Sequence, residues 1–176
     1  SEDNGIRLYN DAYHFIKRQS IFLAVGILLC AVVAAVDYRR WRDNWILTVL
    51  FYLVVVVLLV LVFNYKKVNG SHRWIPIGPV RLQPGELAKI VCVIATAVWY
   101  DRIAWKIDLW KYGILLPGLI VAIPIGLIVM APDFGSVMVI ALAVGLVMFI
   151  AGVKMAHLIP IFLLGMGVVG VIISQN

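Results

Sequence analysis

Long apolar runs separated by short polar segments dominate the chain. A helix needs roughly 17–25 apolar residues to cross the core of a bilayer, which is about 30 Å thick. The run at 46–63 is nearly all Val and Leu. Such a run would favour a strand in water, but in lipid a helix satisfies its own backbone. Further apolar runs lie at 20–36, 86–100, 114–151 and 158–173.

The run at 114–151 is too long for a single crossing. A straight helix over it would extend about 57 Å at 1.5 Å per residue. Its only charge is Asp133, within Ala131-Pro132-Asp133-Phe134-Gly135, a sequence typical of a turn. We therefore expect two spans here, 114–130 and 134–151. The pattern predicts an all-α polytopic membrane protein with about six transmembrane helices, in one transmembrane domain over residues 1–176.

Composition supports a membrane protein and excludes several other classes. Of the 176 residues, 64% are apolar and 14% charged, and the mean hydropathy is +1.02. Soluble domains have about 45–50% apolar and about 25% charged residues. The low charge and the two cysteines also exclude a disordered chain and a disulfide scaffold. The net charge of +6 favours contact with lipid phosphates over nucleic acid.

Several other features carry no predicted chemistry. Cys30 and Cys92 lie in apolar runs and are interpreted as packing residues. Pro117 and Pro124 should kink the fourth span or free its carbonyls. The three histidines have no metal-ligand spacing, and the sequence contains no P-loop, GxSxG, CxxC or HExxH motif. The chain begins Ser-Glu-Asp without a signal-peptide pattern and ends directly after an apolar run, so both ends are expected to continue in a longer protein.

Loop charges leave the orientation undecided but group four candidate residues. Each side of the membrane receives seven Lys or Arg residues, so the positive-inside rule gives no answer. The loop before the third span and the turn after the fourth lie on the same side. Arg73, Arg81, Glu86 and Asp133 are therefore expected to share one membrane face.

The segment 72–89 is the most informative part of the sequence. Its three prolines and two glycines exclude a regular helix up to Gly85. Pro84 suits the first position of a helix, and Glu86 then falls in the first turn, where the helix dipole favours a carboxylate. Glu86 and Lys89 are three residues apart, so they should lie on one helical face.

The charged residues admit two interpretations each. Lys89, about one turn inside the apolar zone, either marks a functional site or extends back to the headgroups. Glu86 is either functional or a helix-start carboxylate, and Asp133 could cap the fifth span without losing a second role. Together they suit an amphiphile with a phosphate or pyrophosphate head. Cations would neutralise the phosphates, and a carboxylate could orient a hydroxyl or hold a divalent cation.

Three motifs resemble those of the SEDS family, the FtsW/RodA/SpoVE proteins. Residues 73–78 followed by 83–89 resemble its "RWI-x-x-G…QPSE-x-x-K" signature. Residues 132–136 resemble its "QPDxGT" turn, and residues 11–19 resemble "dpyyFlkrQ" before its second span. Phe134 favours the FtsW branch.

The resemblance implies a peptidoglycan glycosyltransferase of about ten helices in the bacterial cytoplasmic membrane. Such proteins polymerise lipid II into glycan strands with a class B penicillin-binding protein, in division or elongation. This chain would supply spans two to seven, with the motif face outward. The implied cavity residues are Glu86, Lys89 and Asp133, accompanied by Arg73, Arg81 and Gln83.

Some positions depart from the family pattern. Gly85 replaces a Ser and Ala131 replaces a Gln. The family's catalytic Asp would lie beyond Asn176, so the 176 residues alone are expected to be inactive. Two alternatives stay open: a lipid II flippase, and a non-catalytic membrane scaffold for a penicillin-binding protein.

Overall fold

The computed structural model describes residues 2–35, 37, 39–65, 71–78, 80–154, 160, 167 and 170, in two compact units, Ser1–Arg40 and Trp41–Asn176. The first unit contains α1 (Glu2–Ala35), a helix of 34 residues. Its apolar part, Gln19–Val32, overlaps the predicted first span, 20–36. The helix begins much earlier than that span because no proline interrupts residues 2–19. The short α2 (Arg39–Asp43) follows at the boundary between the units.

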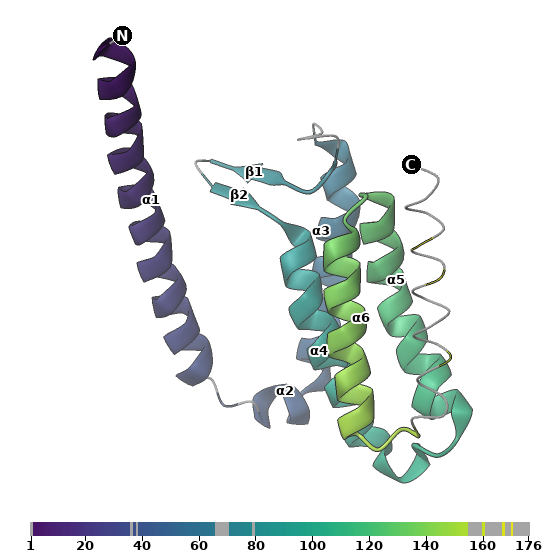
Figure 1. The fold of residues 1–176 in the computed structure, drawn as a ribbon. Coiled ribbons are helices and arrows are strands. Elements are labelled where there is room, and N and C mark those ends of the chain that lie inside the picture. Colours follow the sequence, from purple (N-terminus) through teal and green to yellow (C-terminus); the bar gives the residue numbers. More distant parts are fainter. Residues whose placement is uncertain are drawn as a thin grey trace. The chain divides into compact units, whose positions relative to one another are not determined.

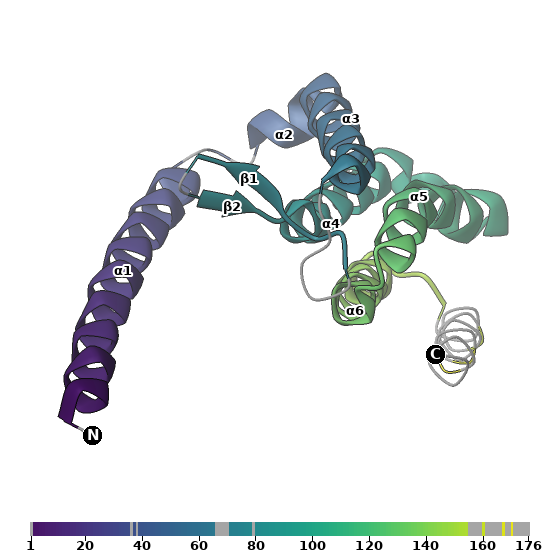
Figure 2. The same ribbon diagram turned by 90° about the horizontal axis from the view of Figure 1, so that it is seen from above.

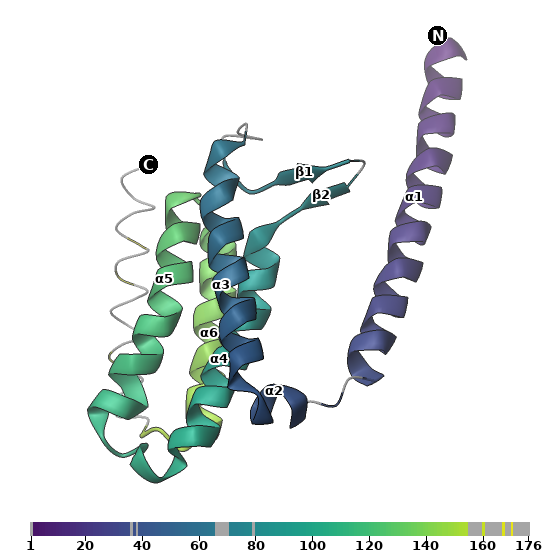
Figure 3. The same ribbon diagram turned by 180° about the vertical axis from the view of Figure 1, so that it is seen from behind.

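The second unit is a bundle of four helices, α3 (Trp45–Leu61), α4 (Pro84–Ile103), α5 (Leu116–Met130) and α6 (Phe134–Ile150). The helix α4 packs against each of the other three, as Figures 1 and 3 show from opposite sides. Figure 2 shows α4 between its neighbours when the bundle is seen from above. Contact with three neighbouring helices explains why α4 buries the residues of one broad face. They are Ala88, Val91, Cys92, Thr96 and Tyr100.

Two helices of the described part are long and apolar enough to cross a membrane, Trp45–Asn64 and Lys111–Met130. The first is α3 with its 3-10 extension η1 (Val62–Asn64). The helix α6 is apolar but shorter, and α4 carries charges near both ends. The predicted sixth span, 158–173, lies outside the described residues except at 160, 167 and 170. The described part therefore supports a mostly helical membrane fold without reaching six spans.

A small β-hairpin corrects the prediction of an all-α protein. The strands β1 (Ile75–Ile77) and β2 (Val80–Leu82) pair antiparallel, with Ile75 opposite Leu82. Pro76 cannot donate a backbone hydrogen bond, which is compatible with a strand at a sheet edge. Gly78 occupies the turn with φ of 59°, a conformation that glycine adopts without a steric cost. The sequence excluded a helix here but did not predict the pairing.

The proline and cysteine predictions have different outcomes. Pro117 lies at the start of α5 directly after a helical turn at Lys111–Leu115, and the Gly113 carbonyl four residues before it accepts from the Tyr100 hydroxyl. Pro124 lies inside α5. Cys92 is buried, as predicted for a packing residue. Cys30 is exposed on α1 taken by itself, so its packing role stays a prediction.

The connection between α4 and α5 contains a 3-10 turn, η2 (Ala104–Lys106), and a π-helical turn, η3 (Lys111–Leu115). A Cβ placed on Gly113 would lie 2.3 Å from the carbonyl oxygen of Ile107, so the turn requires glycine there. Two side chains of α4 hold η3 in place. The Tyr100 hydroxyl donates to the Gly113 carbonyl at 2.5 Å, and the Trp99 ring N–H donates to the Tyr112 carbonyl at 3.0 Å.

Candidate functional site

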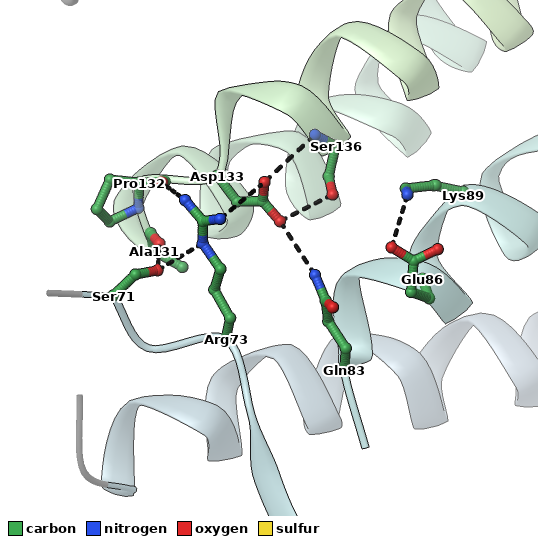
Figure 4. Close-up of polar contacts among 9 residues, drawn as sticks. All are labelled: Ser71, Arg73, Gln83, Glu86, Lys89, Ala131, Pro132, Asp133 and Ser136. Carbon is green, nitrogen blue, oxygen red and sulfur yellow. Dashed lines mark hydrogen bonds and ion pairs between the residues drawn. The ribbon is translucent and has the colours of Figure 1, made fainter. Parts of the chain in front are cut away.

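Three segments far apart in the sequence meet at the end of the bundle that carries the hairpin (Figures 1 and 4). They are the residues that precede β1, the start of α4, and the turn between α5 and α6. Arg73, Gln83, Glu86 and Asp133 all come from these segments. The predicted grouping of the loop before the third span with the turn after the fourth is therefore confirmed.

Asp133 caps α6, as its position after Pro132 predicted. Its carboxylate accepts hydrogen bonds from the Ser136 hydroxyl at 2.8 Å and the Ser136 backbone N–H at 3.4 Å. Only 7% of Asp133 is exposed. The cap satisfies an N–H that has no partner within the helix, and the carboxylate complements the positive end of the helix dipole.

Arg73 connects the segment before β1 to this cap. One guanidinium nitrogen lies 3.7 Å from an Asp133 oxygen, another donates to the Pro132 carbonyl, and Nε donates to the Ser71 hydroxyl at 2.7 Å. The Ser71 hydroxyl in turn donates to the Ala131 carbonyl at 2.6 Å. The guanidinium is thus held by contacts on several of its N–H groups, a geometry that lysine could not reproduce.

Gln83 adds the start of α4 to the same network. Its side-chain N–H donates to Asp133 at 3.4 Å. A Cβ on the neighbouring Gly85 would lie 3.6 Å from the Ser136 hydroxyl and 3.7 Å from Asp133, which is ordinary contact. We call the five interacting side chains the clasp: Ser71, Arg73, Gln83, Asp133 and Ser136 (Figure 4). Because both Asp133 oxygens accept from clasp donors, this carboxylate ties the three segments together.

Glu86 and Lys89 form a separate ion pair on the first turns of α4. The Lys89 ammonium donates to a Glu86 oxygen at 2.7 Å, which confirms that the two share a helical face. The Lys89 side chain is 24% exposed and that of Glu86 is 57% exposed. Within the described residues, no hydrogen bond or ion pair joins this pair to the clasp (Figure 4). The pair can therefore exchange partners without opening the clasp.

The other predicted site residue, Arg81, lies exposed on β2 opposite Pro76. In the part of the chain that the structure describes, it has no ion pair. The His72 Nδ1–H donates to the Tyr65 carbonyl at 2.8 Å. No group of three or more His, Cys, Asp or Glu side chains is clustered for a metal within the described residues.

A small hollow lies beside the clasp, between the start of α4 and the turn after α5. Its apolar wall comes from α3, η1 and α5, and the clasp supplies polar groups on one side. Its lining residues include Leu59, Val62, Pro84, Ile128, Arg73, Gln83 and Asp133. The hollow thus places apolar surface directly beside the charged clasp.

Two members of the clasp were not among the predicted site residues. Ser136 could have been identified from its position three residues after the helix cap, where capping partners are common. Ser71 carries no local signal, because its partner Ala131 is sixty residues away in the sequence. Its role depends on the tertiary structure alone.

Comparison with known proteins gives a consistent result. The family model described as "Cell cycle protein", covering FtsW, RodA and SpoVE, matches residues 3–175. A probable peptidoglycan glycosyltransferase FtsW of Trichlorobacter lovleyi is 33% identical over 92% of this chain and 41% of its own length. The corresponding protein of Thioalkalivibrio is 35% identical over 88% of this chain and 39% of its own length. The chain thus spans about two fifths of the curated relatives it matches.

Solved structures agree with this result. The crystal structure of the rod shape determining protein RodA of Thermus thermophilus has 30% sequence identity and a TM-score of 0.70, over 85% of this chain and 48% of that one. A structure of a peptidoglycan synthase complex, described as coordinating polymerization and crosslinking, has 30% identity and a TM-score of 0.68. It covers 90% of this chain and 45% of the matched one. The helical arrangement is therefore shared with these proteins.

Proposed function

The chain belongs to the FtsW/RodA/SpoVE family of cell cycle proteins. On that basis we propose that it forms part of a peptidoglycan glycosyltransferase. The substrate is a lipid II-type amphiphile with a diphosphate head, polymerised into glycan strands at the outer face of the bacterial cytoplasmic membrane. The similarity to relatives named probable peptidoglycan glycosyltransferase supports the activity.

The observation that carries the proposal is the Glu86–Lys89 ion pair. A lysine one turn inside an apolar helix is costly unless a partner or ligand uses it. Among the described residues the Lys89 ammonium meets a single carboxylate oxygen, at 2.7 Å, and its partner is more than half exposed. A substrate diphosphate can therefore take the place of Glu86 and gain the ammonium as a charge-assisted donor.

The chemistry that follows is charge stabilisation at the leaving group. Glycosyl transfer joins an acceptor sugar hydroxyl oxygen to the anomeric carbon, and the hydroxyl proton passes to a base or to water. The bond between that carbon and the diphosphate breaks, and negative charge grows on the departing phosphate oxygen. An ammonium held at that oxygen stabilises the transition state more than the ground state. The clasp contributes indirectly, because Gln83 directly precedes α4 and Asp133 fixes it.

We also propose that a divalent cation binds beside the Glu86–Lys89 pair, next to the substrate diphosphate. Mg²⁺ is commonly held by one or two carboxylates together with substrate phosphates. Glu86 fits that role, since Lys89 contacts only one of its oxygens and the side chain is exposed. Asp133 does not fit, because clasp donors contact both of its oxygens. A bound cation would add positive charge beside the diphosphate.

Polymerisation of purified lipid II by the protein as its gene encodes it tests the proposal. We expect Lys89→Gln to lower the rate at least about 100-fold, the size of effect found for an electrostatic group that contacts the reacting centre. Lys154→Gln is the matched control, since Lys154 is also paired with a carboxylate, Asp108 at 3.3 Å. Wild-type polymerisation by Lys89→Gln would overturn the proposal.

The two alternatives give different results in the same preparation. A flippase would move lipid II across vesicle membranes even when polymerisation is blocked. A scaffold would co-purify with a penicillin-binding protein and polymerise nothing. We propose such a protein as a partner in either case, because this chain is similar to part of a peptidoglycan synthase complex that joins polymerization to crosslinking.

A further inference from the structure

The connection between α4 and α5 presents two tryptophans to the surroundings. Trp105 is 78% exposed and Trp110 is 57% exposed. This connection lies at the end of the bundle opposite the hairpin and the clasp (Figures 1 and 3). It directly precedes the apolar helix Lys111–Met130, so it lies where that helix would leave a bilayer. Exposed tryptophans at that depth are typical of contact with lipid headgroups.

Two lysines of this connection are held by aromatic rings. The Lys106 ammonium lies 4.0 Å from the centre of the Trp105 ring and 5.1 Å from that of Tyr112. The Lys111 ammonium lies 6.0 Å from the Tyr112 ring. Cation–π contact positions an ammonium but does not neutralise its charge, because the ring has no net charge.

Neighbouring basic residues at the same end of the bundle are instead paired with carboxylates. Lys154 is paired with Asp108 at 3.3 Å, and Arg42 is paired with Asp101 at 3.3 Å. Among the described residues, Lys106 and Lys111 have no carboxylate partner. Asp101 and Asp108 are thus already matched, and the aromatic-held lysines keep their charge for an external anion.

We propose that Trp105, Lys106, Trp110 and Lys111 form a binding site for the headgroup phosphate of an anionic phospholipid. The ammonium groups meet the phosphodiester and the indole rings meet the glycerol and upper acyl region. The ligand is a lipid and not free phosphate, because the exposed rings offer apolar area that a phosphate ion cannot cover. This site is distinct from the Glu86–Lys89 pair and does not depend on the proposed glycosyltransferase activity.

The test titrates the detergent-purified protein, as its gene encodes it, with mixed micelles of phosphatidylglycerol and follows the thermal midpoint. We expect phosphatidylglycerol to raise the midpoint and phosphatidylcholine at the same concentration to leave it nearly unchanged. Lys106→Gln and Lys111→Gln should each raise the half-saturating lipid concentration roughly fivefold. Lys154→Gln removes the same charge from the same end and should raise it less than twofold.

Two further measurements, one on a charge-conserving variant and one with inorganic phosphate, complete the test. The variant carrying Lys106→Arg and Lys111→Arg keeps both charges and should bind like the wild type. An equal loss for Lys154→Gln would mean unspecific attraction and overturn the site. Equal stabilisation by inorganic phosphate would reject the lipid as ligand, and equal stabilisation by phosphatidylcholine would reject the role of the two lysines.

Discussion

A guanidinium nitrogen of Arg73 lies 3.7 Å from a carboxylate oxygen of Asp133, although α4 and α5 separate the two residues in the sequence. The side chains differ in exposure, 38% for Arg73 and 10% for Asp133. Asp133 is therefore the anchored partner, and Arg73 reaches it from the segment before the hairpin. This pair assigns Asp133 a positioning role that its sequence context left open.

Removal of the Asp133 carboxylate should destabilise the bundle. Asp133→Ala loses the cap of α6 and leaves the donors of Arg73, Gln83 and Ser136 without their acceptor. We expect the free energy of unfolding to fall by about 2–3 kcal/mol. Denaturant unfolding in detergent, monitored by circular dichroism, measures this free energy.

Ser71→Ala is the matched control, because it removes a hydroxyl of the same network and leaves the carboxylate in place. It should cost about 1 kcal/mol. The positioning role fails if Asp133→Ala keeps the wild-type free energy of unfolding while substrate binding is lost, since that result describes a direct ligand.

Exchange of the two charges of the Glu86–Lys89 pair separates a structural role from a binding role. The double variant Glu86→Lys with Lys89→Glu keeps an ion pair on the same helical face. An exposed pair is worth at most about 1 kcal/mol, so the thermal midpoint should stay near that of the wild type. Polymerisation should be lost, because the ammonium no longer occupies position 89.

The rate of glycan polymerisation and the thermal midpoint are measured on the same preparation. Lys89→Arg keeps a cation at the position and should retain part of the activity. Full activity of the exchanged variant would show that the pair acts only in folding.

Gly85 should accept a small side chain. A Cβ at this position makes only ordinary contacts, the nearest at 3.6 Å. Gly85→Ala should raise the free energy of unfolding by about 0.5–1 kcal/mol, because alanine restricts the unfolded chain and favours the helix. Gly85→Ser should also be tolerated, since its hydroxyl would lie near Ser136 and Asp133. Thermal unfolding compares them, and Gly85→Val, which overfills the buried space, should lower stability.

Gly113 should not accept even a methyl group. Its Cβ would meet the Ile107 carbonyl oxygen at 2.3 Å, and backbone cannot move aside without opening the turn before α5. We expect Gly113→Ala to lower the free energy of unfolding by about 1–3 kcal/mol. Gly118→Ala, at a position with no atom within 4 Å, is the control and should be neutral or stabilising. Equal stability of the two variants would contradict the close approach.

Local sequence determined the helices and their ends. Apolar runs of the right length predicted α3, α5 and α6 within a few residues, because each helix satisfies its own backbone bonds. Pro84 and Asp133 marked the starts of α4 and α6, since proline and capping carboxylates act within one turn. The Glu86–Lys89 contact followed from a spacing of three residues, which α-helix geometry fixes.

Tertiary structure decided what local spacing cannot encode. The sequence placed Arg73 and Asp133 on one side of the membrane, but only the packing of α4 between α3, α5 and α6 brings them into contact. The hairpin register and the contact of Ser71 with Ala131 likewise join residues whose separation carries no periodic signal. Helix and cap formation depend on neighbours within one or two turns. The clasp depends on where whole helices pack, and many side chains determine that together.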